Sequence, residues 1–372
     1  MEPLPLMNGT NASPTPPSPR LHLLGQSQAE LRAWFEARGH PTYRADQVLE
    51  WIHDRRVDTF DAMTNLSKSL RGWLAGRAEI GRAEVAAESA ANDGTRKLLL
   101  TWPDGQSVET VWIPEPDRHT ACVSSQVGCP VGCRFCASGL AGVQRNLTAG
   151  EIVEQAWQIQ RWIEQADSAS AGGRLTNIVL MGMGEPLANY DAVVQAIRIL
   201  NAPWGAGIGA RRITLSTVGL PKQIRRLADE GLQLNLALSL HAADETLRRE
   251  LIPWGRVPLA DLLDACRYYF ARTGREVTLE YVLLDGVNMN ARQAGELAAF
   301  AGRLRCNVNL LRYNPVPGLP FARPSSEAAH AFQERLRQRG VNAHIRTSRG
   351  RDVDAACGQL RRRFGSTPDI PL

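Results

Sequence analysis

The chain has 372 residues, 44% of them hydrophobic, and a formal net charge of +5. This length and apolar content suffice for a large buried core with a smaller appendage. No apolar run approaches the roughly 20 residues that span a bilayer, and the amino terminus lacks the pattern of a signal peptide. We therefore expect a cytoplasmic protein with no membrane contact. The small basic excess permits a nucleic-acid partner without requiring one.

The first part of the chain divides into a leader, a helical segment and a hairpin. Residues 1–25 are rich in proline and predict a disordered leader. Ser27 and Glu30 have the spacing of a capping box, and apolar residues at helical intervals follow them, so residues 26–90 predict a small helical domain. Short apolar runs on either side of Asp104-Gly105 predict a β-hairpin at 91–118 that links this domain to the main body.

Beyond Thr120, strand-like runs alternate with helical ones, and we assign residues 119–364 to one domain followed by a tail at 365–372. The six runs are TACVSS, NIVLMG (177–182), RITLST (212–217), LNLALSL (234–240), VTLEYVLL (277–284) and NVNLLRY (307–313). Six β/α units predict an α/β fold with a parallel sheet, either open or closed into a partial barrel. Active residues should gather at the carboxyl ends of the strands.

Three of the seven cysteines, Cys129, Cys133 and Cys136, follow the first of these strands on a loop that contains glycine and proline. Three thiolates leave one iron of a cubane cluster open for a substrate, and cysteine is the usual protein ligand of such clusters. The alternative is a structural zinc site with Cys122 as its fourth ligand. The spacing and the strand–loop context favour a catalytic 4Fe-4S cluster that cleaves S-adenosylmethionine.

A second element, Met181-Gly-Met-Gly-Glu185-Pro186, ends the second strand. Its glycines allow a ligand to approach the backbone closely, and the carboxylate can pair with an ammonium group. Taken alone, the glycines would indicate only a turn. At the same end of the sheet as the cysteine loop, they predict the other half of an S-adenosylmethionine site.

From about residue 27 to 364 the sequence resembles the radical SAM superfamily and, within it, the RlmN/Cfr family of RNA adenosine methyltransferases, most of all its RlmN branch. The resemblance rests on RADQVLEWI (44–52), ETVWIPE (109–115), CVSSQVGCPVGCRFC (122–136), NLTAGEI (146–152), MGMGEPL (181–187), LSTVG (215–219), LALSLHA (236–242), YNPVPG (313–318) and RGRDVDAACGQL (349–360). It implies a radical SAM partial (β/α)6 barrel. It also implies an S-adenosylmethionine site lined by Gly184, Glu185, Ser216, Ser239, Leu240, His241 and Asn314.

The resemblance also assigns three catalytic residues. Cys357 matches the cysteine that takes a methyl group from a first S-adenosylmethionine. A second one is cleaved to a 5′-deoxyadenosyl radical, which removes hydrogen from that methyl group before its carbon adds to adenine. Cys122 matches the cysteine that releases the adduct by forming a disulfide, and Glu109 matches the base that takes the adenine proton. From the residues alone, a buried cysteine and a solvated carboxylate would be the simpler interpretations of Cys122 and Glu109.

The implied reaction is methylation of C2 of adenosine in 23S rRNA, and in some members also in transfer RNA. The helical domain would then bind RNA, and an electron donor such as flavodoxin or ferredoxin would reduce the cluster of a monomeric enzyme. Arg211, Arg212 and the run Arg361–Arg363 suit phosphate contacts but also suit a solvated surface. The alternatives are methylation at C8, as in the Cfr branch, modification of a peptide or activation of a partner enzyme through a glycyl radical, and a zinc-stabilised RNA-binding module without catalysis.

Overall fold

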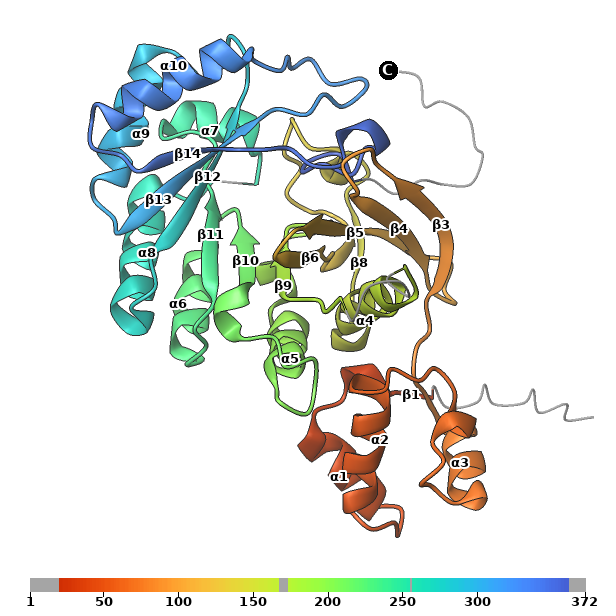
Figure 1. Cartoon of the computed structure of the whole chain (residues 1–372). Coiled ribbons are helices and arrows are strands. Elements are labelled where there is room, and N and C mark those ends of the chain that lie inside the picture. The colour runs from red at the N-terminus through yellow and green to blue at the C-terminus, as the bar shows by residue number, and fades with distance from the viewer. Residues whose placement is uncertain (1–19, 167–172, 255, 361–372) are drawn as a thin grey trace, which may run out of the picture.

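A ten-stranded mixed sheet forms the centre of the molecule (Figure 1). The computed structural model describes residues 20–166, 173–254 and 256–360, so most of the predicted leader, the tail at 365–372 and Arg361–Arg363 lie outside the described residues. The strand order is β14-β13-β12-β11-β10-β9-β6-β5-β4-β3. The strands are β3 (Glu84–Ala90), β4 (Arg96–Thr101), β5 (Ser107–Glu115), β6 (Arg118–Cys122), β9 (Asn177–Leu180), β10 (Ile213–Thr217), β11 (Asn235–Ser239), β12 (Val277–Leu283), β13 (Cys306–Arg312) and β14 (Ala343–Arg346).

Strands β6 and β9 to β13 are the six predicted strands, and all of them pair in parallel. The sequence did not predict β14, a four-residue strand that pairs with β13 and forms one edge of the sheet. The other edge is β3, so the sheet curves without closing, as Figure 1 shows. The predicted partial barrel is confirmed, with one parallel strand more than expected.

Helices cover the convex face of this sheet (Figure 1). Helix α4 begins at a capping box, because the main-chain N–H of Glu151 donates to Thr148 and that of Thr148 donates to the Glu151 carboxylate. The short α7 and the later α10 were not predicted. The helices are α4 (Ala149–Ala166), α5 (Tyr190–Asn201), α6 (Pro221–Asp229), α7 (Glu245–Leu251), α8 (Leu259–Thr273), α9 (Ala291–Ala301) and α10 (Ser326–Arg337).

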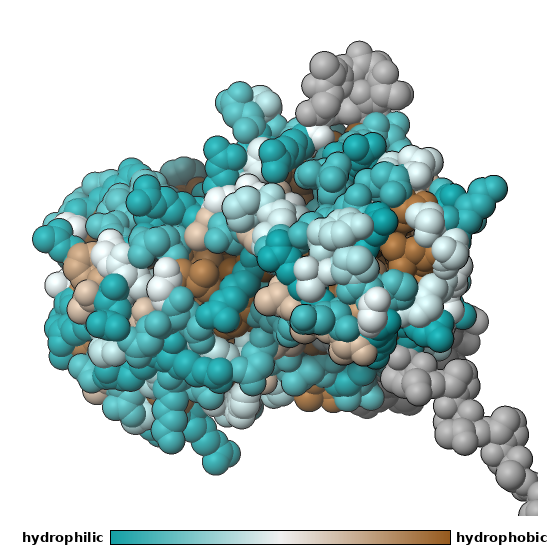
Figure 2. Space-filling view, turned by 90° about the horizontal axis from the view of Figure 1, so that it is seen from below, coloured by the Kyte–Doolittle hydropathy of each residue, from teal (hydrophilic) through white to brown (hydrophobic). Residues whose placement is uncertain are grey.

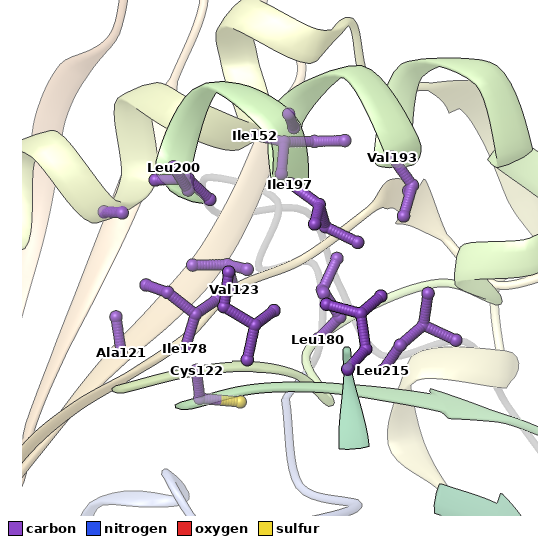
Figure 3. Packing of buried hydrophobic residues seen from close by; sticks show 14 of the residues in the cluster. Ala121, Cys122, Val123, Ile152, Ile178, Leu180, Val193, Ile197, Leu200 and Leu215 are labelled. Atoms are coloured by element: carbon purple, nitrogen blue, oxygen red, sulfur yellow. The ribbon is translucent and has the colours of Figure 1, made fainter. Parts of the chain in front are cut away.

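The core between the sheet and helices α4 and α5 contains aliphatic side chains (Figure 3). Ile152 and Ile197 extend from the helices towards Val123 and Ile178 of the sheet, and all four are no more than 1% exposed. Fully burying each such side chain contributes about 1.5–3 kcal/mol. Cys122 lies on the other face of the sheet from these residues, because side chains alternate along a strand. The alternation therefore turns the Cys122 thiol away from the helices.

Strands β4 and β5 form the predicted hairpin. Its turn closes where the N–H of Trp102 donates to the carbonyl of Gln106, and Gly105 has a φ of +74°. The hairpin continues the main sheet, because β5 pairs with β6 and β4 pairs with β3. The hairpin is therefore part of the central sheet and is more than a link between the helical domain and the main body.

The amino-terminal part consists of three helices and two short strands that pack against α4. They are β1 (Leu21–His22), α1 (Gln28–Glu36), α2 (Tyr43–His53), α3 (Lys68–Ala75) and β2 (Ala78–Glu79), and the predicted capping box of Ser27 and Glu30 begins α1. Leu23 and Leu24 are fully buried, so the last residues of the predicted leader at 1–25 belong to the folded part. Trp157 of α4 donates its indole N–H to the carbonyl of Ile52 at 2.9 Å and fastens the two parts together.

The face seen from below Figure 1 is largely hydrophilic, with hydrophobic residues visible only in small separate areas (Figure 2). Within the described ranges, none of the helices combines the length and the apolar character needed to cross a membrane.

Candidate active site

A pocket at the carboxyl ends of the parallel strands brings most of the predicted site residues together. Its lining includes Cys357 and Gly358 on the segment that follows β14, and Figure 1 shows this segment at the end of the sheet away from helices α1 to α3. Of the predicted residues, those that line it are Cys129, Cys133, Cys136, Gly184, Glu185, Ser216, Ser239, His241, Asn314 and Cys357. The fold therefore gathers residues that are more than 200 positions apart in the sequence.

The cysteine loop leaves β7 (Gln126–Gly128) and is held by its own backbone. Gly128 has a φ of +78°, and the N–H of Cys136 donates to the carbonyl of Cys133 at 3.1 Å. All three thiols pack against a second, smaller apolar cluster that includes Val131 and Phe135. Burial raises the pKa of Cys129 to about 12 and raises the pKa values of Cys133 and Cys136 as well. A bound metal cluster would favour the thiolate forms at neutral pH.

The glycines of the second motif are required by chain packing. A Cβ atom on Gly182 would lie 2.8 Å from the main-chain nitrogen of Ser124, and one on Gly184 would lie 2.8 Å from that of Gln126. Gly184 also has a φ of +108°. From the sequence we explained these glycines by the approach of a ligand. In the structure, the segment after β6 fills the space beside their Cα atoms.

We expect Gly184→Ala to lower the free energy of unfolding by about 2–5 kcal/mol, because it combines a strained φ with a backbone clash. Gly105→Ala is the matched control, since Gly105 has a φ of +74° and nothing within 4 Å of its would-be Cβ atom. Strain alone should cost the control about 1–2 kcal/mol. Urea unfolding followed by circular dichroism measures both values, and equal losses would contradict this account.

Glu185 is almost fully buried and already bonded on both oxygens. One oxygen accepts the N–H of Leu187 at 3.0 Å and the other that of Val218 at 2.8 Å. Burial raises the pKa of Glu185 to about 7, although these hydrogen bonds oppose the rise. The carboxyl group thus ties the end of β10 to the glycine segment, and Glu185 also lines the pocket.

His241 has an unusual backbone and a defined tautomer. Its φ is +56°, and its Nδ1 accepts the N–H of Val282 at 3.0 Å. Burial lowers its pKa to about 3, with a further contribution from Arg248, so the ring is neutral. The proton therefore resides on Nε2, which is free to donate to a ligand. Leu240, which was predicted beside it, is fully buried in the main core and does not line the pocket.

The segment that carries Cys357 is fastened to the cysteine loop and to β13. The N–H of Ala137 donates to the carbonyl of Gly358 at 2.8 Å, and the Ser138 hydroxyl donates to that of Leu360 at 2.6 Å. The amide of Asn314 donates to the carbonyl of Cys357 at 3.2 Å. These bonds hold Cys357 at the same pocket as the three loop cysteines.

Cys357 is an exposed residue that lines the pocket, while its thiol lies among protein atoms. This crowding raises its pKa, and the neighbouring Cys122, Cys136 and Glu280 raise it further. Cys122 is buried, and burial raises its pKa to about 12. The two thiols are thus close enough to influence each other, although only Cys357 lines the pocket.

Two family models match the chain. The model of the ribosomal RNA large subunit methyltransferase N-terminal domain of RlmN matches residues 21–80, and that of the radical SAM superfamily matches residues 123–298. A probable dual-specificity RNA methyltransferase RlmN of Gloeobacter violaceus is 47% identical over 342 residues, which are 92% of this chain and 95% of that protein. The dual-specificity RNA methyltransferase RlmN of Marinobacter nauticus is 45% identical and covers 92% of each chain.

The chain belongs to the RlmN family of radical SAM methyltransferases. A solved structure agrees with this. The crystal structure of a radical SAM methyltransferase from Sphaerobacter thermophilus superposes with a TM-score of 0.88 at 48% identity and covers 92% of this chain and 99% of that one. The predicted family and the radical SAM fold are thereby confirmed.

Membership of the radical SAM superfamily implies a 4Fe-4S cluster and S-adenosylmethionine, and the residues present fit both. The cysteine loop offers three thiols on one open pocket, which is the donor set of a cluster with a free iron. In the part of the chain described, no three His, Cys, Asp or Glu side chains lie close enough to hold a single metal ion. The thiols that hold a cubane cluster need not converge on one ion, because each protein thiolate binds a separate iron.

Glu109, which was predicted as the base, lies on β5 and is not among the residues that line the pocket. The side chain is 3% exposed and forms an ion pair with Lys97 of β4, whose Nζ is 2.9 Å from its Oε1. The carbonyl of Glu109 accepts a hydrogen bond from the hydroxyl of Ser124 at 2.8 Å. Sequence reasoning did not find Lys97, because a lysine in a strand usually points to solvent.

Glu280 is a second residue that sequence reasoning missed. It lies on β12, lines the pocket and accepts a hydrogen bond from the amide of Asn309 at 2.9 Å. Burial raises its pKa to about 7, against the effects of Asn309 and Arg346. A single charged residue within the apolar run VTLEYVLL was a signal that could have identified it.

Proposed function

We propose that this RlmN family protein methylates C2 of adenosine in 23S rRNA, and in some transfer RNAs, with Cys357 as the carrier of the methyl group. Each turnover uses two S-adenosylmethionine molecules. The observation that supports this most strongly is the pair of hydrogen bonds from Ala137 and Ser138 to the Cys357 segment. They hold the carrier thiol beside the loop that would ligate the cluster, with Cys122 as its neighbour.

The carrier acts first as a nucleophile. The Cys357 thiolate attacks the methyl carbon of one S-adenosylmethionine, and S-adenosylhomocysteine leaves as the C–S bond breaks. A cluster held by Cys129, Cys133 and Cys136 would supply the electron that cleaves a second S-adenosylmethionine and would accept one electron from the adduct between Cys357 and adenine. Between these events, the 5′-deoxyadenosyl radical removes one hydrogen from the methyl group on Cys357, and the remaining carbon bonds to C2 of adenine. Ser216 and Ser239, whose hydroxyls are 3.2 Å apart, would bind polar groups of the cofactor.

Release requires a base and a second thiol. Glu109 takes the proton from C2 of adenine. The Cys122 thiolate attacks the sulfur of Cys357, so an S–S bond forms as the C–S bond breaks. The electron pair of that bond stays with the carbon, which takes a proton and becomes the new methyl group. A dithiol reductant then reopens the disulfide before the next turnover.

The proposed RNA substrates are supported by the descriptions of the family model and of the relatives. The description of the amino-terminal family model names large-subunit ribosomal RNA, and the relatives carry the words dual-specificity, which supports two kinds of RNA substrate. We propose that helices α1 to α3 bind RNA and that flavodoxin or ferredoxin reduces the cluster. An enzyme that acts on ribosomal RNA works where that RNA is assembled, so we propose a cytoplasmic location. We also propose that the enzyme acts as a monomer.

The test is anaerobic incubation with S-adenosylmethionine, a reductant and a transcribed fragment of 23S rRNA, with a transfer RNA in parallel. We expect 2-methyladenosine, identified by mass spectrometry and NMR of the nucleosides. An 8-methyladenosine product would overturn the choice of C2 and support the Cfr type. A protein that binds zinc and produces no methylated nucleoside would support the non-catalytic RNA-binding alternative.

A further inference from the structure

A buried ion pair links two neighbouring strands next to the residues from Asp354 to Leu360, which hold Cys357 and are called the carrier segment below. Lys97 of β4 and Glu109 of β5 are diagonal neighbours on one face of the sheet, because Glu109 lies opposite Leu99 in the register. Their charged atoms are 2.9 Å apart, and the side chains are 5% and 3% exposed. Such burial of two opposite charges requires close contact and further hydrogen bonds to offset desolvation.

The ammonium group of Lys97 makes one of these further bonds to the carrier segment. Its Nζ donates to the carbonyl of Asp354 at 3.1 Å, three residues before Cys357. One cation therefore touches both the carboxylate of Glu109 and the backbone of the segment that holds the carrier thiol. These two partners are more than 240 residues apart in the sequence.

This pair differs from the ordinary ion pairs of the same strands. The adjacent Arg96 pairs with Glu88 at 2.8 Å, but both side chains are 37% exposed. An exposed pair contributes about 0–1 kcal/mol. A buried pair is also weak evidence for stability, since apolar side chains of similar size often serve as well. Stability therefore does not explain why two charges are buried next to the carrier segment, and their position points to a role in the reaction at Cys357.

We propose that Lys97 is a positioning residue for the release step. Its ammonium group fixes the position of the Glu109 carboxylate that accepts the proton, and it holds the Cys357 segment in register with that carboxylate. Lys97 acts through these two partners and does not itself contact RNA. This inference rests on the proposed function, in which Glu109 takes the proton from adenine.

The test is Lys97→Gln, which can still form hydrogen bonds but has no charge. Iron content and methylation of Cys357, measured on the intact protein by mass spectrometry, should stay as in the unmodified protein. Release of RNA from the Cys357 adduct should slow by about 10- to 100-fold, so that a covalent protein–RNA species accumulates on a denaturing gel. Lys97→Arg keeps the cation and should restore most of the release. Arg96→Met is the control that removes a neighbouring exposed cation, and it should release RNA at the normal rate.

Two outcomes would overturn the role of Lys97. One is release from Lys97→Gln at the normal rate. The other is joint loss of iron, Cys357 methylation and activity without any adduct, which would mean that Lys97 only supports the fold. Cys122→Ala, examined in parallel, separates this inference from the proposed function. If Cys122→Ala traps RNA and Lys97→Gln does not, only the inference fails, whereas absence of the adduct from both would count against the carrier mechanism itself.

Discussion

Replacing Cys122 with alanine is expected to leave RNA covalently attached to the protein. The adduct through Cys357 would form as usual, but the thiolate that attacks the Cys357 sulfur would be missing. Formation of the adduct should stop after about one event per protein molecule, because each carrier becomes blocked. A denaturing gel with labelled RNA would show a band that resists heat and detergent and disappears after nuclease treatment.

Cys266→Ala is the matched control for this variant. Cys266 is also a buried free cysteine, and burial raises its pKa to about 12, as it does for Cys122. It lies on α8 and does not line the pocket. The control should turn over repeatedly without a trapped species. Free release of methylated RNA from Cys122→Ala would contradict the proposed role of Cys122.

Replacing Cys133 with alanine is expected to abolish reductive cleavage of S-adenosylmethionine. Two thiols would remain on the loop, which is too few to hold the cluster with one free iron. The rate of 5′-deoxyadenosine formation should fall by about three orders of magnitude or more, and the iron content should fall with it. Both quantities are measured on anaerobically purified protein, by chromatography and by metal analysis.

Cys306→Ala serves as the control, because Cys306 is a half-buried cysteine like those of the loop but lies at the start of β13. It should keep full iron content and full cleavage. Normal cleavage by Cys133→Ala, or equal losses in the two variants, would show that the loop does not hold the cluster. In contrast to Cys122→Ala, the Cys133 variant should trap no RNA.

The six parallel strands and the cysteine loop could be predicted because their signals are local. Each strand is a short apolar run, and the loop couples cysteines at fixed spacing with glycines such as Gly128, whose φ is +78°. Strand β14 was missed because it is four residues long and only two of them are hydrophobic. A strand of this kind forms because β13 offers it a hydrogen-bonding edge, which the sequence does not reveal.

The parts of the site that the residues alone did not predict depend on contacts between segments distant in the sequence. Lys97 looks like a surface lysine until the fold places Glu109 and the carbonyl of Asp354 next to it. Gly184 lines the pocket, but the sequence does not reveal that the backbone of Gln126 also fills the space beside it. Cys357 was found by resemblance alone, since an isolated cysteine has no pattern that distinguishes a carrier from a packing residue.

The central claim is that the methyl carbon passes through Cys357 and loses one hydrogen on the way. It is tested most directly with S-adenosylmethionine that carries a fully deuterated methyl group, followed by mass spectrometry of both products. The account predicts two deuterium atoms in the new methyl group of adenosine and one in 5′-deoxyadenosine. Three deuterium atoms in the adenosine product, with none in 5′-deoxyadenosine, would indicate direct transfer and contradict the account.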